Sequence, residues 1–286
     1  MIKGVKILGI NAGPREGNTS VLVKEALKAA GEMKNVETEY LSMHNHKVTH
    51  CNSCRLCYAD KGGLRPDAET FCPSFGKKDD GDLFVRKTIE CDGMIIGSPT
   101  HEFDISAECK ALFGRICKPF DEHVITPWLS VNRFKPIGAC TTSYTSHGGA
   151  EATVASILRF ATGLGYLAVG SAMTTEPDHN PISGHFGGVG AVNTSKDWWN
   201  PEAITPEMSR IKPPAIAIQA MRSARCCGRN VATVALIVKN GMAGLKDNGF
   251  EIPKVSFPKR WPKAEIKKGS YMEYLVEQGI VQAVEE

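Results

Sequence analysis

Short apolar segments alternate with amphipathic ones along most of the chain. Five segments predict strands, most of them apolar and rich in branched side chains: 6–10, 36–41, 93–97, 135–140 and 166–170. Six others have helical spacing or capping signals: 19–33, 79–90, 105–116, 150–162, 215–239 and 271–284. Strands that alternate with helices predict an α/β protein with a parallel, doubly wound sheet and helices on both faces.

Three segments depart from this alternation. Residues 44–80 form a long cysteine-rich excursion, and residues 175–214 hold many Gly, Pro, Asn and His without periodicity. A structureless stretch of that length predicts a functional loop, here called the flap. Residues 249–286 are basic and interrupted by proline. We therefore expect one domain over 1–248, with the cysteine loop and the flap inserted, and a C-terminal extension over 249–286.

Composition excludes several classes of protein. The 286 residues are 42% hydrophobic and 23% charged, with a net charge of +3 that is too small to argue for nucleic-acid binding. No apolar run approaches the roughly 18 residues needed to span a membrane. The start leads directly into a strand without a signal-peptide pattern, so we expect a cytoplasmic protein. In that compartment ten cysteines indicate metal ligands or reduced thiols, not disulfides.

The clearest chemical motif is C-x2-C-x2-C at Cys51, Cys54 and Cys57. Thiolates bind both zinc and iron–sulfur clusters, but three within seven residues suit a cubane better than zinc, which usually takes separated pairs. Cys72 is the nearest candidate for a fourth ligand. Zinc, or a redox dithiol of Cys51 and Cys54, remains the alternative. Five later cysteines lie within predicted helices or directly after them and are interpreted as packing thiols: Cys91, Cys109, Cys117, Cys226 and Cys227.

Three loops follow predicted strands, at the sheet edge where doubly wound proteins bind ligands. In loop 11–20, Gly13 allows close approach of the backbone and Arg15 supplies charge. Asn18 and Thr19 supply donors beside the N-terminus of a helix. That combination predicts a phosphate site, with an ordinary capped turn as the alternative. The loop lacks the lysine–threonine ending of an ATP-binding loop and the G-x-G-x-x-G of a dinucleotide fold.

The other two loops, 98–103 and 141–149, are rich in hydroxyls and backbone donors and carry little charge. Such loops suit a flat polar heterocycle. Its ring could stack on His101, Phe103 or Tyr144.

These motifs, in this order, resemble the flavodoxin-like NAD(P)H-dependent FMN reductase superfamily and, within it, the iron–sulfur flavoproteins. The match rests on residues 13–19, the cysteine motif, and Gly97–Thr100 followed by Ser106–Lys110. It covers about residues 3–172 and the late helix around 225–238. Two features depart from the family pattern. Ala12-Gly13 stands where relatives commonly have Gly-Ser, so one hydroxyl for the phosphate is missing, and fourteen residues separate Cys57 from Cys72.

The resemblance implies a flavodoxin-like five-stranded sheet that binds FMN and a [4Fe–4S] cluster. It places the FMN phosphate on the first loop, at Gly13, Arg15, Asn18 and Thr19. It places the isoalloxazine ring between the other loops, at Ser98, Pro99, Thr100, His101, Phe103, Thr141, Thr142, Tyr144, Gly148 and Gly149. The cluster ligands fall on Cys51, Cys54, Cys57 and Cys72.

A flavin exchanges one or two electrons and a cubane exchanges one, so both in one chain predict a redox converter. We expect an oxidoreductase that takes electrons from a ferredoxin-like donor or NAD(P)H and passes them to a small acceptor. The alternatives are an NAD(P)H-dependent FMN or quinone reductase with a zinc-bound or cluster-free loop, and a non-enzymatic flavodoxin-like carrier. We also expect a homodimer or homotetramer, with the basic segment Lys254–Lys268 as a docking site for an acidic ferredoxin.

Overall fold

The computed structural model describes residues 2–57, 69–117, 134–143, 148–171, 188–191, 218–249, 260–279 and 281–285. Contacts divide the chain into two compact units. The first, called the sheet unit, comprises Met1–Asn45, Cys91–Cys109 and Lys135–Asn240. The second, called the cysteine unit, comprises His46–Glu90, Lys110–Phe134 and Gly241–Glu286. The domain boundary expected at residue 248, between residues 1–248 and the C-terminal extension, stays a prediction.

The sheet unit contains a parallel sheet in the order β2-β1-β3-β5-β6. Its strands are β1 (Val5–Asn11), β2 (Val36–Ser42), β3 (Gly93–His101), β5 (Pro136–Ser143) and β6 (Leu167–Val169). All five predicted strands are therefore confirmed, as is the doubly wound arrangement. The order reverses between β1 and β3, which is where such sheets bind ligands beyond the carboxyl ends of their strands.

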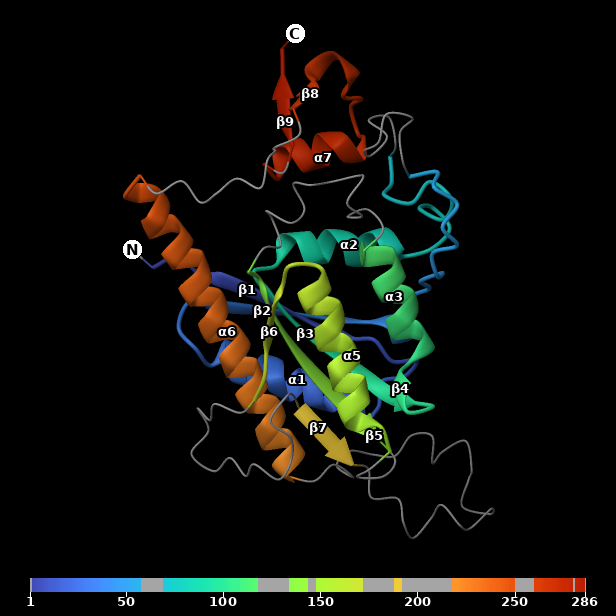
Figure 1. The fold of residues 1–286 in the computed structure, drawn as a ribbon, viewed down its shortest axis with the longest axis vertical. Coiled ribbons are helices and arrows are strands. Elements are labelled where there is room, and N and C mark those ends of the chain that lie inside the picture. The colour runs from blue at the N-terminus through green and yellow to red at the C-terminus, as the bar shows by residue number, and fades with distance from the viewer. Residues whose placement is uncertain are drawn as a thin grey trace. The chain divides into compact units, whose positions relative to one another are not determined.

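Helices lie on both faces of this sheet (Figure 1). Helices α1 (Asn18–Gly31) and α6 (Ile218–Asp247) share one face, and α5 (Ala150–Gly163) lies on the other. The apolar stripes predicted from periodicity form the core between α1, α6 and the sheet: Ile7, Leu22, Ala26, Ile95, Val231 and Ala235 are all buried there. Burial of these stripes stabilises both the helices and the central strands.

Two short strands extend the sheet beyond the prediction. Residues 98–101, expected as a loop, continue β3. Ser98 and Pro99 pair in parallel with β5, and Thr100 and His101 pair antiparallel with β4 (Asp104–Ile105). Within the predicted flap, β7 (Gly188–Ala191) pairs in parallel with β5. That part of the flap was wrongly predicted to be without regular structure. The remainder of the flap lies outside the described residues.

The cysteine unit holds α2 (Gly81–Glu90), α3 (Ala107–Cys117) from Lys110 onward, the 3₁₀ turn η6 (Lys263–Glu265) and α7 (Tyr271–Glu277). The 3₁₀ turn η1 (Met43–Asn45) belongs to the sheet unit instead. The guanidinium of Arg86 on α2 lies 4.7 Å from the ring centre of Tyr271 and 4.4 Å from that of Tyr274. These cation–π contacts join the C-terminal extension to α2.

The predicted helix 271–284 was wrong beyond its second turn. Helix α7 ends at Glu277, and Gly279 adopts a left-handed φ of 70° that terminates it. The following residues Gln282–Val284 form β9, which pairs with β8 (Arg260–Pro262). Among the helices of the described residues, none combines the length and apolarity needed to cross a membrane.

Candidate functional site

The loop between β1 and α1 has the geometry of an anion site. Helix α1 begins at Asn18, and Gly17 at its N-cap offers no side-chain hydrogen bond. The first N–H groups of a helix have no acceptor within the helix, so they remain available to an anion. The Asn18 amide oxygen is buried without a hydrogen-bond partner. Since amide oxygen and nitrogen exchange places by rotation, Asn18 can instead present its donor nitrogen to a phosphate.

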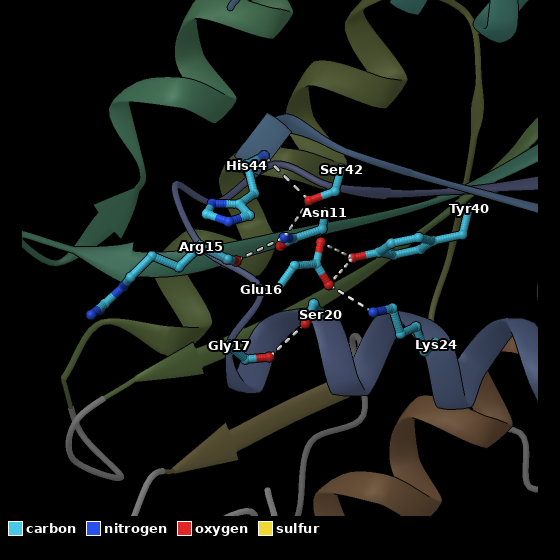
Figure 2. A network of polar contacts seen from close by, with 9 residues as sticks. All are labelled: Asn11, Arg15, Glu16, Gly17, Ser20, Lys24, Tyr40, Ser42 and His44. Atoms are coloured by element: carbon cyan, nitrogen blue, oxygen red, sulfur yellow. Dashed lines mark hydrogen bonds and ion pairs between the residues drawn. The ribbon is translucent and has the colours of Figure 1, made fainter. Parts of the chain in front are cut away.

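Side chains from β1, β2 and η1 hold the backbone of this loop in place (Figure 2). The amide nitrogen of Asn11 donates to the Arg15 carbonyl at 2.9 Å and to the Ser42 hydroxyl at 3.0 Å. The His44 Nδ1 atom lies 2.9 Å from the Pro14 carbonyl oxygen. Figure 2 shows the Arg15 side chain extending away from these contacts. The loop is therefore anchored through its backbone, while the Arg15 guanidinium stays free of this network.

Glu16 is an unexpected carboxylate in a loop suited to anions, and its charge is compensated locally. Lys24 donates to its Oε2 atom at 2.7 Å and the Tyr40 hydroxyl donates to its Oε1 atom at 2.8 Å (Figure 2). Partial burial raises the pKa of Glu16, but hydrogen bonds from Lys24, Ser42 and Tyr40 outweigh it and lower that pKa to about 2. Burial, together with the bond to Glu16, raises the pKa of Tyr40. Glu16 thus stays ionised and ties the loop to α1 and β2.

We expect Glu16→Gln to lower the free energy of unfolding by about 1 kcal/mol at pH 7. This loss is smaller than for a buried ion pair, because Glu16 and Lys24 are partly exposed to solvent. A carboxylate whose pKa falls from 4.5 to about 2 on folding stabilises the folded state above pH 4.5. That contribution disappears as the pH falls toward 2. Urea unfolding at pH 7 and pH 3 should therefore show a smaller difference between wild type and variant at the lower pH. Glu37→Gln, at an exposed position of β2, is the control, and an equal effect of both substitutions would contradict the prediction.

Hydroxyl groups bring the three predicted loops together at the carboxyl edge of the sheet. The Thr19 hydroxyl lies 2.6 Å from that of Thr142, which connects the first loop to the third. The Thr100 hydroxyl lies 3.1 Å from that of Thr141, which connects the second loop to the third. The register of β3 and β5 supports this, because Ser98 and Pro99 are paired with Thr141 and Thr142 in the sheet. The loops expected to hold one ligand thus line one edge.

The first and second loops also touch directly. The Ser106 hydroxyl donates to the Ala12 carbonyl at 2.7 Å, and the Ser106 backbone donates to the Ser98 hydroxyl at 2.9 Å. A Cβ atom on Gly13 would lie 2.9 Å from Cδ of Pro99, so no side chain fits at this position. Glycine is therefore required where the two loops approach each other.

The tip of the β3–β4 hairpin is strained and carries an exposed ring. Glu102 and Phe103 adopt positive φ angles of 46° and 69°, which are unfavourable for non-glycine residues. The Phe103 residue is 71% exposed. Its backbone packs against Gly149, the N-cap of α5, where φ is 89° and an added Cβ would lie 2.6 Å from Phe103. Strain of this kind is concentrated at functional sites, which supports a role for this hairpin in ligand binding.

The predicted cofactor residues fall into three groups. Those that line the shared edge or directly adjoin it are Gly13, Asn18, Thr19, Ser98, Pro99, Thr100, Thr141, Thr142, Gly148 and Gly149. Arg15, His101 and Phe103 are exposed around it. Tyr144 lies outside the described residues.

Several residues of this site were not predicted. Asn11, Glu16, Lys24, Tyr40, Ser42, Ser106 and Thr153 hold the loops but were given no role. The position of Asn11 at the end of a buried strand was a usable signal, since an amide there must find partners.

In the cysteine unit, the backbone curls around the C-x2-C-x2-C motif. Ser53 and Arg55 both adopt left-handed φ angles, 56° and 62°. The Ser53 backbone donates to Sγ of Cys51 at 3.4 Å. The Cys54 thiol lies 2.9 Å from the Ser74 hydroxyl, beyond Cys72 in the sequence. The two halves of the loop therefore meet near the thiols.

Burial and neighbouring groups shift the pKa values of three of these thiols. Burial, with smaller contributions from charges at Cys72, Cys51 and Cys54, raises the pKa of Cys57 to about 11. Burial also raises the pKa of Cys72, although the Arg115 charge opposes this. The hydroxyl of Ser74 lowers the pKa of Cys54.

The four cysteines of this loop are donors of the chemical type that iron–sulfur clusters take. Over the described residues, no three His, Cys, Asp or Glu side chains converge as ligands of a single ion would. A cubane takes one thiolate at each of its irons, so its ligands need not meet at one point. The remaining five predicted packing thiols are buried, except for Cys117, which is half-buried.

The strand order and the three loops at its carboxyl edge define a flavodoxin-like protein. A model of the family described as NADPH-dependent FMN reductase matches residues 5–179. An iron–sulfur flavoprotein of Methanocaldococcus jannaschii is 30% identical over 82% of this chain and 100% of its own length. One of Archaeoglobus fulgidus is 26% identical over 82% of this chain and 98% of its own.

The chain belongs to the NADPH-dependent FMN reductase family and, within it, to the iron–sulfur flavoproteins. It is an FMN-dependent oxidoreductase. The crystal structure of RosB with a bound intermediate shares the fold, with a TM-score of 0.54 and 14% identity over 91% of this chain and 97% of RosB.

Proposed function

We propose that this oxidoreductase binds a [4Fe–4S] cluster on Cys51, Cys54, Cys57 and Cys72 besides FMN. In this proposal it passes electrons between a one-electron donor or NAD(P)H and a small acceptor. The observation that carries the proposal is the set of four thiols in one loop, whose two halves meet where the Cys54 Sγ atom lies 2.9 Å from the Ser74 hydroxyl. The relatives named iron–sulfur flavoproteins support it.

The FMN phosphate is proposed to bind at the N-terminus of α1, with Arg15, Asn18 and Thr19. The anchored backbone of the loop, the uncapped helix start and the unpartnered Asn18 amide support this assignment. The ring is proposed to lie along Ser98–Phe103 and Thr141–Gly149. FMN supplies the exchange of one or two electrons, while the protein binds, orients and shields the ring.

The donor and acceptor are proposed from chemistry. Since a cubane exchanges single electrons, a ferredoxin-like protein is a suitable donor, and its acidic surface would complement the basic segment Lys254–Lys268. NAD(P)H is the two-electron alternative. A homodimer or homotetramer would be consistent with the placement of FMN at subunit contacts in this family.

Anaerobic purification tests the proposal directly. We expect one FMN and about four iron and four sulfide per chain, with a broad absorbance shoulder beside the flavin bands. Reduction by NADPH and by a reduced ferredoxin, followed with a quinone acceptor, identifies the donor. Flavin with zinc and no sulfide would contradict the cluster and favour a reductase with a zinc-bound loop. Both cofactors without turnover with any acceptor would instead favour an electron carrier.

A further inference from the structure

Within the cysteine unit, the buried guanidinium of Arg115 on α3 joins two separate arms of the cysteine loop. The first arm is residues 46–57 and carries three of the proposed ligands. The second arm is residues 69–82 and carries Cys72. The Arg115 side chain is 3% exposed. Its Nη1 atom donates to the Thr49 carbonyl of the first arm at 3.2 Å and to Asp79 of the second arm at 2.6 Å.

The carboxylates that face Arg115 also hold the backbone of both arms. Asp79 accepts from the Thr49 backbone at 2.9 Å and from the Gly81 backbone at 3.0 Å. Asp82, 3.6 Å from Nη2 of Arg115, accepts from the Phe71 backbone at 2.6 Å. Thr49 lies two residues before Cys51, and Phe71 directly precedes Cys72. A single side chain thus acts close to the first and the fourth proposed ligand.

The surroundings of Arg115 are tightly packed. A Cβ atom on Gly81 would lie 2.5 Å from the guanidinium, and the Phe75 ring centre lies 5.6 Å away. The Asp79 side chain has no exposed surface. On the same helix, the Cβ position of Gly114 lies 3.7 Å from Cβ of Cys51, so α3 lies directly against the first arm.

A buried ion pair is a poor source of net stability, because desolvation offsets its attraction. It does fix geometry, because breaking it leaves an uncompensated buried charge. The positive charge of Arg115 would also affect the reduction potential of the proposed cluster. A cluster held by four thiolates is anionic, and a buried cation near it favours the reduced state, which is more negative.

We propose that Arg115 is a positioning residue for the four-thiol site, which holds both arms at the separation a cluster requires and offsets the cluster's negative charge. The inference rests on the proposed cluster but concerns residues that do not contact it. Arg115 acts through Asp79, Asp82 and the backbone of Thr49.

The test compares Arg115→Met and Arg115→Lys with wild type and with Lys110→Met. The last variant loses the same charge from an exposed position on the same helix. Each full-length protein is reconstituted anaerobically with iron and sulfide, and its FMN content verifies folding. The two measurements are the rate at which a chelator removes iron and the reduction potential of the cluster.

We expect Arg115→Met to lose iron about 10-fold faster than wild type. Removing a residue that orients metal ligands typically weakens metal binding by about 10- to 100-fold, and we expect the lower end of that range. Its potential should become more negative. Arg115→Lys should restore the potential, because the charge returns. It should not restore the retention of iron, because one ammonium cannot contact Thr49 and Asp79 and also face Asp82 as the guanidinium does. Lys110→Met should behave as wild type. Iron retention and potential equal to wild type in Arg115→Met would overturn the proposal.

Two further measurements distinguish a failure of the Arg115 proposal from a failure of the proposed cluster. If Arg115→Met does not fold, Asp82→Asn tests the contact with Arg115 at nearly constant side-chain volume. We expect this variant to lose iron faster than wild type, and loss at the wild-type rate would overturn the proposal. If wild type itself takes up no iron, the proposed cluster fails. Alkylation of the half-buried Cys57 thiol in metal-free protein then tests Arg115 alone. Faster modification in Arg115→Met would support the positioning role, and an equal rate would refute it.

Discussion

Cys72→Ser is expected to lower the iron and sulfide content of anaerobically purified protein to about a tenth while FMN is retained. A serine hydroxyl is a much poorer ligand for iron than a thiolate. Cys72 lies on the second arm, and the hydroxyl of Ser74 on that arm lies 2.9 Å from the Sγ atom of Cys54 on the first arm. Iron, sulfide and flavin are measured per chain in one preparation.

The control for this variant is Cys117→Ser. Cys117 is a half-buried thiol in the same unit, and its Sγ atom lies 3.7 Å from the Gly114 carbonyl oxygen. It should keep full iron content, because serine can make the same contact. If Cys72→Ser also keeps its iron, the fourth ligand is another group and the assignment of Cys72 is wrong.

Gly149→Ala should lower the free energy of unfolding by about 2 kcal/mol or more and weaken FMN binding. Two effects add: a left-handed φ of 89° costs an alanine about 1 kcal/mol, and its Cβ would lie 2.6 Å from the Phe103 backbone. The β3–β4 hairpin must then move away from α5. Urea unfolding and titration of FMN fluorescence measure the two consequences.

The other end of α5 provides the matched control, Gly163→Ala. No atom lies within 4 Å of a Cβ at Gly163, and this residue is helical. The variant should gain up to about 1 kcal/mol, because alanine loses less backbone entropy than glycine in a helix. Equal losses of stability in both variants would contradict the explanation by backbone geometry and contact with Phe103.

The helices and strands that were predicted correctly are determined by residues close to one another in the sequence. Apolar runs such as 93–97 and the helical stripe through Leu22 and Ala26 carry their own period, so the element type follows from local spacing. The same is true of the loop around Gly13 and of the cysteine motif. Their positions at the ends of strands then follow from the parallel sheet.

Two of the failures share one cause, which is pairing between distant segments. Strand β7 has weak local signals and is stabilised by its ladder with β5, some fifty residues away. Residues 98 and 99 became strand because they pair with β5, about forty residues later, and β4 then folds back on residues 100 and 101. Helix α7 stopped early at Gly279, a local signal that the apolar spacing of 271–284 obscured.

By itself, the sequence determined the alternation of strands and helices, the placement of a glycine-bearing loop before a helix, and the spacing of three thiols. Each is a property of adjacent residues. Only the tertiary structure decided that Glu16 is held by Lys24 and Tyr40, and that Arg115 joins Thr49, 66 residues earlier, to Asp79. Such contacts depend on how the chain returns on itself, because a charged side chain becomes buried only where packing supplies its partner.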